Sequence, residues 1–266
     1  MRMLLTIALP LLVIACETIQ TTQPGAVGVE RRQTMLVSDQ EITQAAGQEY
    51  QKVIADARSK GTLDRNAQHV QRVKNVLSRL IPQTAAFRPD APQWSWEIHV
   101  IEDPQLNAWA MPGGKMVVYS GLIDKLRLTD SELAAIMGHE LSHSLREHAR
   151  ERVSQEMATG LAVGIAGAAL GLGDIGQQLA NAVAKVTFSL PHNRTQETEA
   201  DRLGVELAAR AGYDPHAAIS VWQKMLDASG SGGPQFLSTH PAPEARLADL
   251  RVYADRVMPL YQQARR

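Results

Sequence analysis

The stretch "GHELSH", residues 138 to 143, places two histidines four positions apart, with a glutamate directly after the first. Because an α-helix turns by about 100° per residue, His139 and His143 would project from one face of a helix, one turn apart. Two imidazoles in that relation can occupy neighbouring corners of a tetrahedral zinc ion. Glu140 would point about 100° away from His139, near enough to meet a water on the metal without becoming a ligand.

The chemistry that this H-E-x-x-H spacing supports is hydrolysis of an amide bond. Zinc lowers the pKa of a bound water towards about 7, Glu140 takes its proton, and the hydroxide attacks a carbonyl that the metal polarises. The protonated glutamate then donates to the leaving amine. The alternative is an ordinary charged helix face in solvent, so a third ligand has to decide between the two.

The residues after the motif exclude one class of zinc peptidase. A metzincin needs H-E-x-x-H-x-x-G-x-x-H, whereas residue 146 is arginine and residue 149 is alanine. His148 is off-register for that pattern, and we expect it on the surface. A carboxylate from a later helix is the other route to a third ligand, and "NRTQETEADRLG" (193–204) supplies candidates.

The elements that must position these residues can be read from the apolar pattern. Apolar residues recur at threes and fours from Ser38 to Ala57 and from Val70 to Ile81, which predicts two helices. "WSWEIHVI" (94–101) alternates instead, which predicts a half-buried strand. In the following "NAWAMPGGKMVVYSGLI", the Pro-Gly-Gly run predicts a turn, so a small hairpin or three-stranded sheet precedes the motif.

The motif itself is expected well inside a helix. Thr129 or Asp130 can serve as the N-cap, with Glu132 in the first turn and apolar residues on one stripe after it. Gly138 costs this helix roughly 1 kcal/mol relative to alanine, and it permits a close backbone approach beside the site. Three later segments are also predicted to be helical, the last of them near the C-terminus.

The uncharged stretch 157–173, "MATGLAVGIAGAALGLG", has three interpretations. Its small residues could pack a membrane-dipping helix closely in lipid. It is short for a full span, which needs about 20 residues, and its glycines also suit a core helix or a mobile flap over a cleft.

Composition bounds the class of protein. The chain has 266 residues, 44% hydrophobic and 21% charged, with a formal net charge of -1. These values fit one medium-sized globular domain. A nucleic-acid surface normally shows as a basic excess or stripe, and the interleaved charges here exclude that partner.

The first residues, "MRMLLTIALPLLVIAC", have the layout of a signal peptide: Arg2, an apolar run, and then the only cysteine, Cys16. The ending "VIAC" resembles the lipobox of bacterial lipoproteins, which implies cleavage before Cys16 and its acylation. The alternative is an uncleaved anchor or a buried N-terminal helix. We therefore expect a signal peptide at 1–15, a lipidated N-terminus and polar tether at 16–37, and a single domain at 38–266.

The segment 193–204 resembles the second motif of the HtpX and CAAX prenyl protease type of zinc metallopeptidase, Ser-Arg-x-x-Glu-x-x-Ala-Asp. Arg194, Glu197, Ala200 and Asp201 match it, and Asn193 stands where serine is usual. The resemblance implies that Glu197 is the third ligand of one zinc ion per chain, beside the two motif histidines.

The same register gives the neighbouring residues their expected places. Asp201 follows Glu197 by one helical turn on the same face, where it can accept a hydrogen bond from a zinc-bound histidine and fix its tautomer. Arg194 is expected to support the site with it. Glu199 points elsewhere and is expected on the surface.

Two further segments extend the resemblance over most of the chain. "LNAWAMPGG" is similar to a family segment that forms an edge strand beside the metal, on which a peptide can add as another strand; here that strand comprises Asn107, Ala108, Trp109 and Ala110. "STHPAPEARLADL" resembles Thr-His-Pro-x-x-x-x-Arg of periplasmic BepA-like members. It implies that His240 is an inhibitory fourth ligand or a donor to the oxyanion. The alternative for "LNAWAMPGG" is a plain structural hairpin. The alternative for His240 is a histidine held at the start of a helix.

The resemblance implies an α+β, mostly α, gluzincin-like metallopeptidase domain with a small sheet whose edge strand borders the zinc. We expect a zinc endopeptidase that degrades misfolded or unassembled envelope proteins. It would be anchored by lipid in a bacterial periplasm, with the outer membrane favoured by Glu17, like BepA-like or LoiP-like lipoproteins without helical repeats.

A rival from another class is an envelope chaperone or assembly factor whose zinc is structural or held closed by His240. A thermolysin-like aminopeptidase is disfavoured, because the Gly-x-Met-Glu-Asn type of segment that would hold a substrate amine is absent from the sequence.

Overall fold

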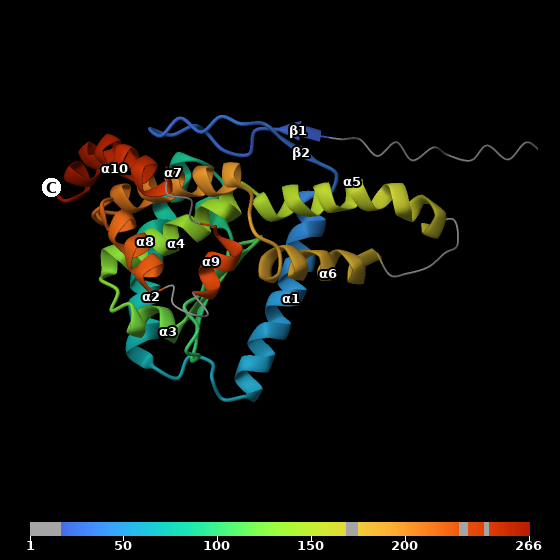
Figure 1. Cartoon of the computed structure of the whole chain (residues 1–266), viewed down its shortest axis with the longest axis horizontal. Coiled ribbons are helices and arrows are strands. Elements are labelled where there is room, and N and C mark those ends of the chain that lie inside the picture. The colour runs from blue at the N-terminus through green and yellow to red at the C-terminus, as the bar shows by residue number, and fades with distance from the viewer. Residues whose placement is uncertain (1–16, 169–174, 229–233, 242–244) are drawn as a thin grey trace, which may run out of the picture.

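Helix α4 (Asp130–Leu145) carries the H-E-x-x-H motif and is buried along nearly its whole length. The computed structural model describes residues 17–168, 175–228, 234–241 and 245–266, and the side chains of 160–175 lie outside that description. A capping box at Thr129 and Glu132 starts α4, as predicted. Its most extensive partner is α7 (Arg194–Arg210), and α8 (Ala217–Asp227) covers another side (Figure 1).

Gly138 and Gly204 mark the point where α4 and α7 cross. A Cβ atom on Gly138 would lie 2.8 Å from the backbone oxygen of Gly204. A Cβ atom on Gly204 would lie 2.7 Å from the backbone nitrogen of His139. The close approach predicted at Gly138 is confirmed, and it brings two ligand-bearing helices into backbone contact.

A three-stranded sheet packs beside α4. Its strands are β3 (Glu97–Ile101), β4 (Ala108–Met111) and β5 (Lys115–Tyr119), in the order β3-β5-β4. β3 runs parallel to β5, and β4 pairs antiparallel to β5 through the predicted turn at 112–114. The first strand begins at Glu97 rather than Trp94, because Trp94 still bonds back to Ala91 at the end of a 3-10 turn.

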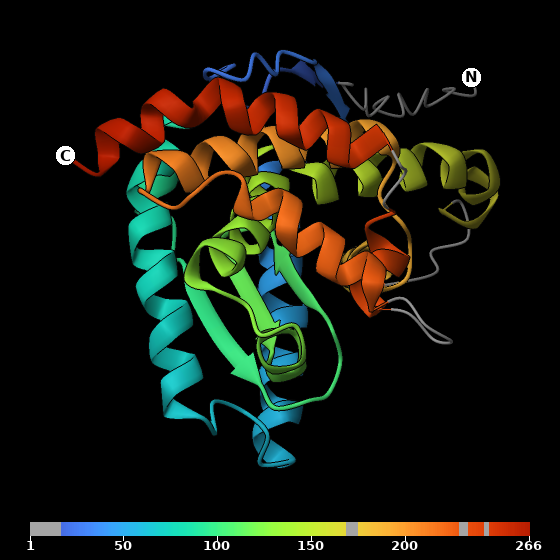
Figure 2. The same ribbon diagram turned by 60° about the vertical axis from the view of Figure 1, so that its left-hand side comes forward.

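The sheet separates two hydrophobic cores. Helix α1 (Asp39–Ser59) and α6 (Ile175–Phe188) pack on the face that presents Trp109, Met111 and Val117. Helix α2 (Ala67–Leu80), α4, α7, α8 and α10 (Ala245–Ala264) share the core on the other face (Figure 2). The described fold also contains the short elements η1 (Ile81–Ala86), η2 (Ala91–Gln93), α3 (Ser120–Lys125) and α9 (Gln235–Thr239). The prediction of a mostly helical α+β domain is confirmed.

Helices α5 (His148–Ala168) and α6 lie side by side and extend beyond the rest of the domain (Figure 1). The segment 157–173 begins as part of α5, but its residues 169–174 and the side chains from 160 on lie outside the described residues. None of the described helices is long and apolar enough to cross a membrane.

The structure corrects the prediction of a polar tether for residues 17–37, which we call the N-terminal strap. The polar composition of this segment predicts a tether, yet the strap is folded onto the domain and contains β1 (Glu17–Ile19) paired with β2 (Gln33–Met35). Four of its apolar residues are buried, namely Val27, Val29, Met35 and Val37. It runs along α5 and α7 (Figures 1 and 2). The side chain of Arg31 pairs with buried carboxylates on both helices, so the folded unit includes residues before 38. Cys16 lies outside the described residues.

Candidate metal centre and active site

Four buried side chains converge beneath the sheet. One donor atom each from His139, His143, Glu197 and His240 lies within 4.8 Å of every other, and each residue is at most 5% exposed. The two histidines come from adjacent turns of α4, Glu197 from the first turn of α7, and His240 from the end of α9. Asn193 caps α7 by accepting from Gln196 N–H, which a serine at that position could equally do. The described part of the chain thus contains a group able to hold a metal ion.

The orientation of His139 is set by a carboxylate. Its Nδ1 lies 2.9 Å from Oδ1 of Asp201, so the contact predicted between the two residues is present. Arg246 donates to both oxygens of Asp201, at 2.6 and 2.7 Å, and its guanidinium lies 3.5 Å from the ring centre of Trp222. An ionised Asp201 only accepts hydrogen bonds, so His139 carries its proton on Nδ1 and presents a lone pair at Nε2.

His143 is oriented through a second histidine. Its Nδ1 lies 2.8 Å from Nδ1 of His148, whose Nε2 lies 3.0 Å from Oε2 of Glu199. Because Glu199 accepts, His148 donates from Nε2 and accepts at Nδ1, so His143 donates from Nδ1. His143 therefore also presents a lone pair at Nε2.

Two sequence expectations fail at this point. His148 and Glu199 are buried rather than on the surface. In a continuous helix, position 148 would point about 140° away from position 143. Helix α4 ends before that, and Glu147 adopts a left-handed backbone conformation with φ of 52°, which turns the chain and returns His148 to His143.

The unprotonated nitrogen atoms of the two motif histidines show whether a metal ion fits among these side chains. Nε2 of His139 and Nε2 of His143 lie 3.0 Å apart, and neither carries a proton in the tautomers derived above. Among the described residues, Glu197 Oε1 and His240 Nε2 are buried without a hydrogen-bond partner. A metal cation among these atoms would satisfy them together, so the residues fit a metal ion.

The electrostatics of the group agree with that conclusion. Burial, opposed by Arg246 and assisted by Asp201, raises the pKa of Glu197 to about 8. Burial and the neighbouring His192 hold the pKa of His143 well below its usual range. Without a cation the protein environment favours the uncharged form of each group, and a bound cation reverses that balance for the carboxylate.

Glu140 is held by the edge strand. Its Oε2 accepts a hydrogen bond of 3.1 Å from the backbone N–H of Ala110. Its Oε1 is buried, has no hydrogen bond within the described chain, and lies 3.4 Å from Nε2 of His240. Burial and the charge of Glu197 raise the pKa of Glu140 well above its usual value. One oxygen is thus fixed by the strand while the other faces the metal group.

His240 is packed on both ring faces. The ring of Phe236 stacks on it at 4.2 Å between centres, and the ring of His192 lies 5.0 Å away at 25°. Its Nδ1 lies 3.2 Å from the carbonyl of Phe236 and can donate to it, which directs Nε2 towards His139, His143 and Glu140. The structure places this histidine in the metal group itself.

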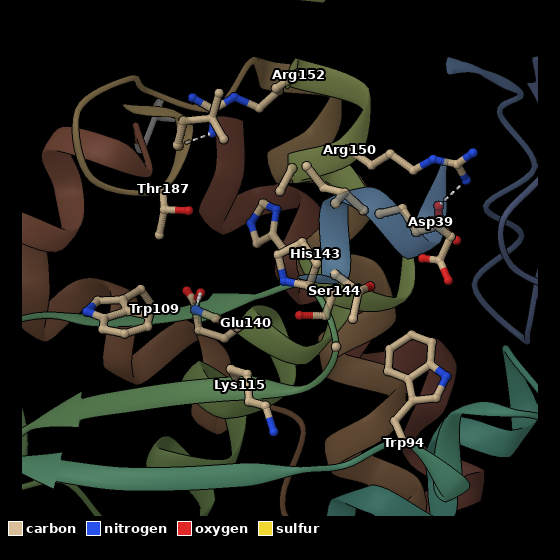
Figure 3. A pocket seen from close by; sticks show the side chains of 18 of the residues that line it. Asp39, Trp94, Trp109, Lys115, Glu140, His143, Ser144, Arg150, Arg152 and Thr187 are labelled. Carbon is tan, nitrogen blue, oxygen red and sulfur yellow. Dashed lines mark hydrogen bonds and ion pairs between the residues drawn. The ribbon is translucent and has the colours of Figure 1, made fainter. Parts of the chain in front are cut away.

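A cavity of about 400 Å³ opens beside Glu140 (Figure 3). Its walls come from the sheet and from α1, α4, α5 and α6. The labelled residues of Figure 3 that line it are Asp39, Trp94, Trp109, Lys115, Glu140, His143, Ser144, Arg150, Arg152 and Thr187. Apolar atoms make up most of this lining, and His192 and His240 complete it on the side of the metal group.

The edge strand β4 turns main-chain groups towards this cavity. Asn107 accepts from Tyr119 N–H, so Asn107, Trp109 and Met111 form the hydrogen-bonded positions with β5. Ala108 and Ala110 alternate with them and point their main-chain groups away from β5. The four residues expected in the edge strand, 107 to 110, thus lie at a free edge of the described sheet.

One predicted residue is misplaced, and others were not predicted. The Arg194 side chain is exposed and makes no hydrogen bond or ion pair within the described chain, so the expectation that it supports the site is wrong. Arg246 supports the site instead of Arg194. Its position in the Thr-His-Pro-x-x-x-x-Arg segment could have indicated this role from the sequence. His192 had no signal, because only the fold brings its ring to 4.1 Å from that of His143.

Comparison with known proteins extends these observations. The family model of "Peptidase family M48" matches residues 67–254. The chain is 36% identical over 177 residues to the mitochondrial metalloendopeptidase OMA1 of Schizosaccharomyces pombe, which covers 66% of this chain and 50% of that protein. It is 33% identical over 178 residues to the beta-barrel assembly-enhancing protease of Escherichia coli, covering 62% and 36%.

Human OMA1 is 28% identical over 241 residues, covering 86% of this chain and 44% of that protein. The chain thus spans half the length of these curated relatives or less. The family match covers well over half of the chain and includes the described H-E-x-x-H helix, Glu197 and His240. The chain therefore belongs to peptidase family M48.

Proposed function

We propose that this chain is a zinc-dependent endopeptidase that cleaves extended segments of misfolded or unassembled proteins of a bacterial envelope. The observation that carries the proposal is the convergence of four buried donors with a carboxylate, Glu140, that faces them without belonging to them. A purely structural metal site has no use for such a carboxylate.

The donor set favours zinc. His139, His143 and Glu197 offer two nitrogen atoms and one carboxylate, which is a common set in catalytic zinc sites, with one ion per chain. Asp201 and His148 would keep both imidazoles in the tautomer that binds through Nε2.

The protein's own groups would handle the proton. A bound zinc ion supplies Lewis acidity, polarising the scissile carbonyl and acidifying a water. Glu140 would take a proton at Oε1, because Oε2 is engaged by Ala110 N–H, and deliver it to the leaving amine. The buried position of Glu140 keeps that proton from bulk solvent.

The cleft favours an extended peptide. A peptide lying along β4 could donate to the outward carbonyls of Ala108 and Ala110, whose N–H groups are engaged by Asn107 and Glu140; such contacts recognise backbone rather than sequence. Its side chains would enter the largely apolar cavity beside Trp94 and Trp109. Only an unfolded or partly unfolded protein offers such a strand, which supports quality control as the role.

The cellular site is part of the proposal. The N-terminal sequence and the lipobox-like Cys16 support a signal peptide at 1–15 and lipid anchoring of a LoiP-like or BepA-like lipoprotein in the periplasm, on the outer membrane by preference. The E. coli relative is named for assembly of β-barrels, which supports envelope proteins as substrates. The OMA1 relatives, in contrast, are mitochondrial by name.

A second candidate follows from His240. With its Nε2 in the metal group, four protein donors could close the site, and closed four-coordinate zinc is usually structural or latent. The chain would then be a chaperone or assembly factor, or a peptidase held inactive until His240 leaves.

The deciding experiment measures zinc content and cleavage of an unfolded casein-type protein by the full chain in mild detergent. Wild type, Glu140→Gln and His240→Ala are compared, with Glu102→Gln, an exposed glutamate on the surface, as the control. We expect about one zinc in every form, cleavage lost in Glu140→Gln alone, and faster cleavage by His240→Ala.

Other outcomes have defined meanings. Slower cleavage by His240→Ala would make His240 a donor to the oxyanion rather than a latch. Zinc without cleavage by any form, His240→Ala included, would favour the chaperone. Cleavage that survives Glu140→Gln would overturn the proposed mechanism.

A further inference from the structure

A single arginine of the N-terminal strap bridges two helices behind the metal group. Nε and Nη2 of Arg31 donate to Glu199 on α7, at 2.6 and 3.1 Å, and its Nη1 and Nη2 donate to Glu151 on α5. Both carboxylates are buried, with side chains 7% and 5% exposed. A planar guanidinium is suited to this double fork, which a lysine ammonium cannot reproduce.

Glu199 is also the last member of the chain of contacts that begins at a metal-facing histidine. His143 contacts His148, and His148 contacts Glu199. The other motif histidine needs no such extension, because Asp201 contacts it directly and is held by Arg246. The two histidines are therefore supported in parallel ways, each ending on a carboxylate that is fixed by arginine.

The strap itself is fixed at several points, so Arg31 is held in place. Arg146 donates to the carbonyl of Arg31 at 2.8 Å, and Gln33 donates to Glu151 and to the carbonyl of Arg146. Farther along the strap, Val27 N–H donates to the buried carboxylate of Glu206. These contacts join residues more than 100 positions apart, so they exist only when the strap is docked.

We propose that the N-terminal strap is a working part of the metal site, in which Arg31 acts as a positioning residue for His143 through Glu199 and His148. The inference rests on the proposed metal-binding function and goes beyond it, because the strap precedes the region that the family model matches, 67–254. Without Arg31, Glu199 loses two hydrogen bonds and keeps, among the described residues, Arg146 and His148 as charged or ring partners, so the acceptor of His148 is held less firmly.

The test measures zinc affinity of the metal-free full chain by competition with a chromophoric chelator. Arg31→Ala is expected to weaken zinc binding about tenfold, within the range usual for losing an outer partner of a ligand. Arg31→Lys should recover only part of that loss. Arg32→Ala is the matched control, since Arg32 is the exposed neighbour and, among the described residues, its side chain donates only to the carbonyl of Thr18. The zinc affinity of this variant should equal that of wild type.

A double-mutant cycle separates positioning from a general loss of stability. If Arg31 acts through His148, Arg31→Ala should weaken zinc binding little further in a His148→Asn background. Equal losses in both backgrounds, or an Arg31→Ala affinity equal to that of Arg32→Ala, would overturn the inference. Thermal unfolding of the metal-free variants checks folding, and Arg31→Lys serves if Arg31→Ala does not fold.

Asp201→Asn keeps this test distinct from that of the proposed function. It removes the direct carboxylate partner of His139 and should weaken zinc binding whether or not the strap matters. Weakening by Asp201→Asn without any effect of Arg31→Ala would reject the strap proposal alone. If wild type itself binds no zinc, the proposed function fails first.

Discussion

At the scale of single residues, the two oxygens of Glu140 have different partners. Ala110 N–H fixes Oε2, and Oε1 faces the metal group. The strand that we propose to bind substrate therefore also holds the catalytic carboxylate. Because the ladder bonds of β4 come from Asn107, Trp109 and Met111, the donor at Ala110 can be removed without breaking the ladder.

Ala110→Pro removes that donor. Proline is tolerated on an edge strand where its missing N–H faces away from the ladder. A hydrogen bond to a charged group contributes about 1.5–3 kcal/mol, so we expect cleavage to slow roughly tenfold to a hundredfold. Zinc content and the circular dichroism spectrum should stay as in wild type. Unchanged kcat would show that Ala110 does not hold Glu140 during the reaction.

Single site residues also differ in whether the sequence alone could predict them. His139, Glu140 and His143 follow from spacing within one helix, and Glu197 and Asp201 from spacing within another. His148, Glu199 and Arg31 could not be predicted, because their contacts depend on the chain turning at Glu147 and on a docked strap. Local periodicity carries no information about either.

At the scale of elements, the crossing of α4 and α7 sets the distance between ligands. His139 follows Gly138 directly, and Glu197 and Asp201 lie on the helix that carries Gly204. The backbone contact at the two glycines leaves no room for a methyl group. The close packing at this crossing therefore determines the distances between the metal ligands on α4 and those on α7.

Gly204→Ala should push the helices apart. Overpacking of this kind costs roughly 1–3 kcal/mol, and zinc affinity should fall with stability, because the ligands on α4 and α7 separate. Gly47→Ala on α1 is the control, since a Cβ atom there meets nothing within 4 Å. It should be neutral or stabilising by about 0.4–1 kcal/mol. Denaturant unfolding and chelator competition measure both effects; a Gly204→Ala protein with wild-type affinity would contradict the coupling.

Helices and the sheet were largely predictable at this scale, because capping residues and apolar periodicity are local signals. The capping boxes at Ser38 and Thr129 and the turn at 112–114 are examples. The folded strap could not be predicted. Its sequence resembles that of a polar linker, because the partners of its valines and charged residues on α5 and α7 are distant in the sequence.

At the scale of the whole molecule, the metal group joins parts of the chain that are distant in sequence. Its donors come from α4, α7 and the end of α9, and their supports come from the strap and α10. A ligand that binds only the folded state stabilises that state by mass action. The metal should therefore stabilise the entire domain and not only the elements next to the site.

Removing the metal should lower the unfolding temperature. Free zinc at 100 times its Kd adds about 2.7 kcal/mol, so chelation should lower Tm by roughly 5–10 °C. Glu140→Gln should show the same shift, since it keeps all four donors, and zinc added back should restore Tm. Scanning calorimetry measures the difference. A Tm that stays constant after zinc is removed would show that the site is not coupled to the fold.

The placement of Arg31 and Arg246 also constrains when the peptidase can become active. Arg31 precedes the H-E-x-x-H helix and Arg246 follows it, and both hold carboxylates that orient the motif histidines. A ribosome releases the N-terminal side first. A nascent chain that already contains the H-E-x-x-H helix still lacks Glu197, His240 and Arg246. The order of synthesis therefore leaves the proposed catalytic centre incomplete until Arg246 has been made.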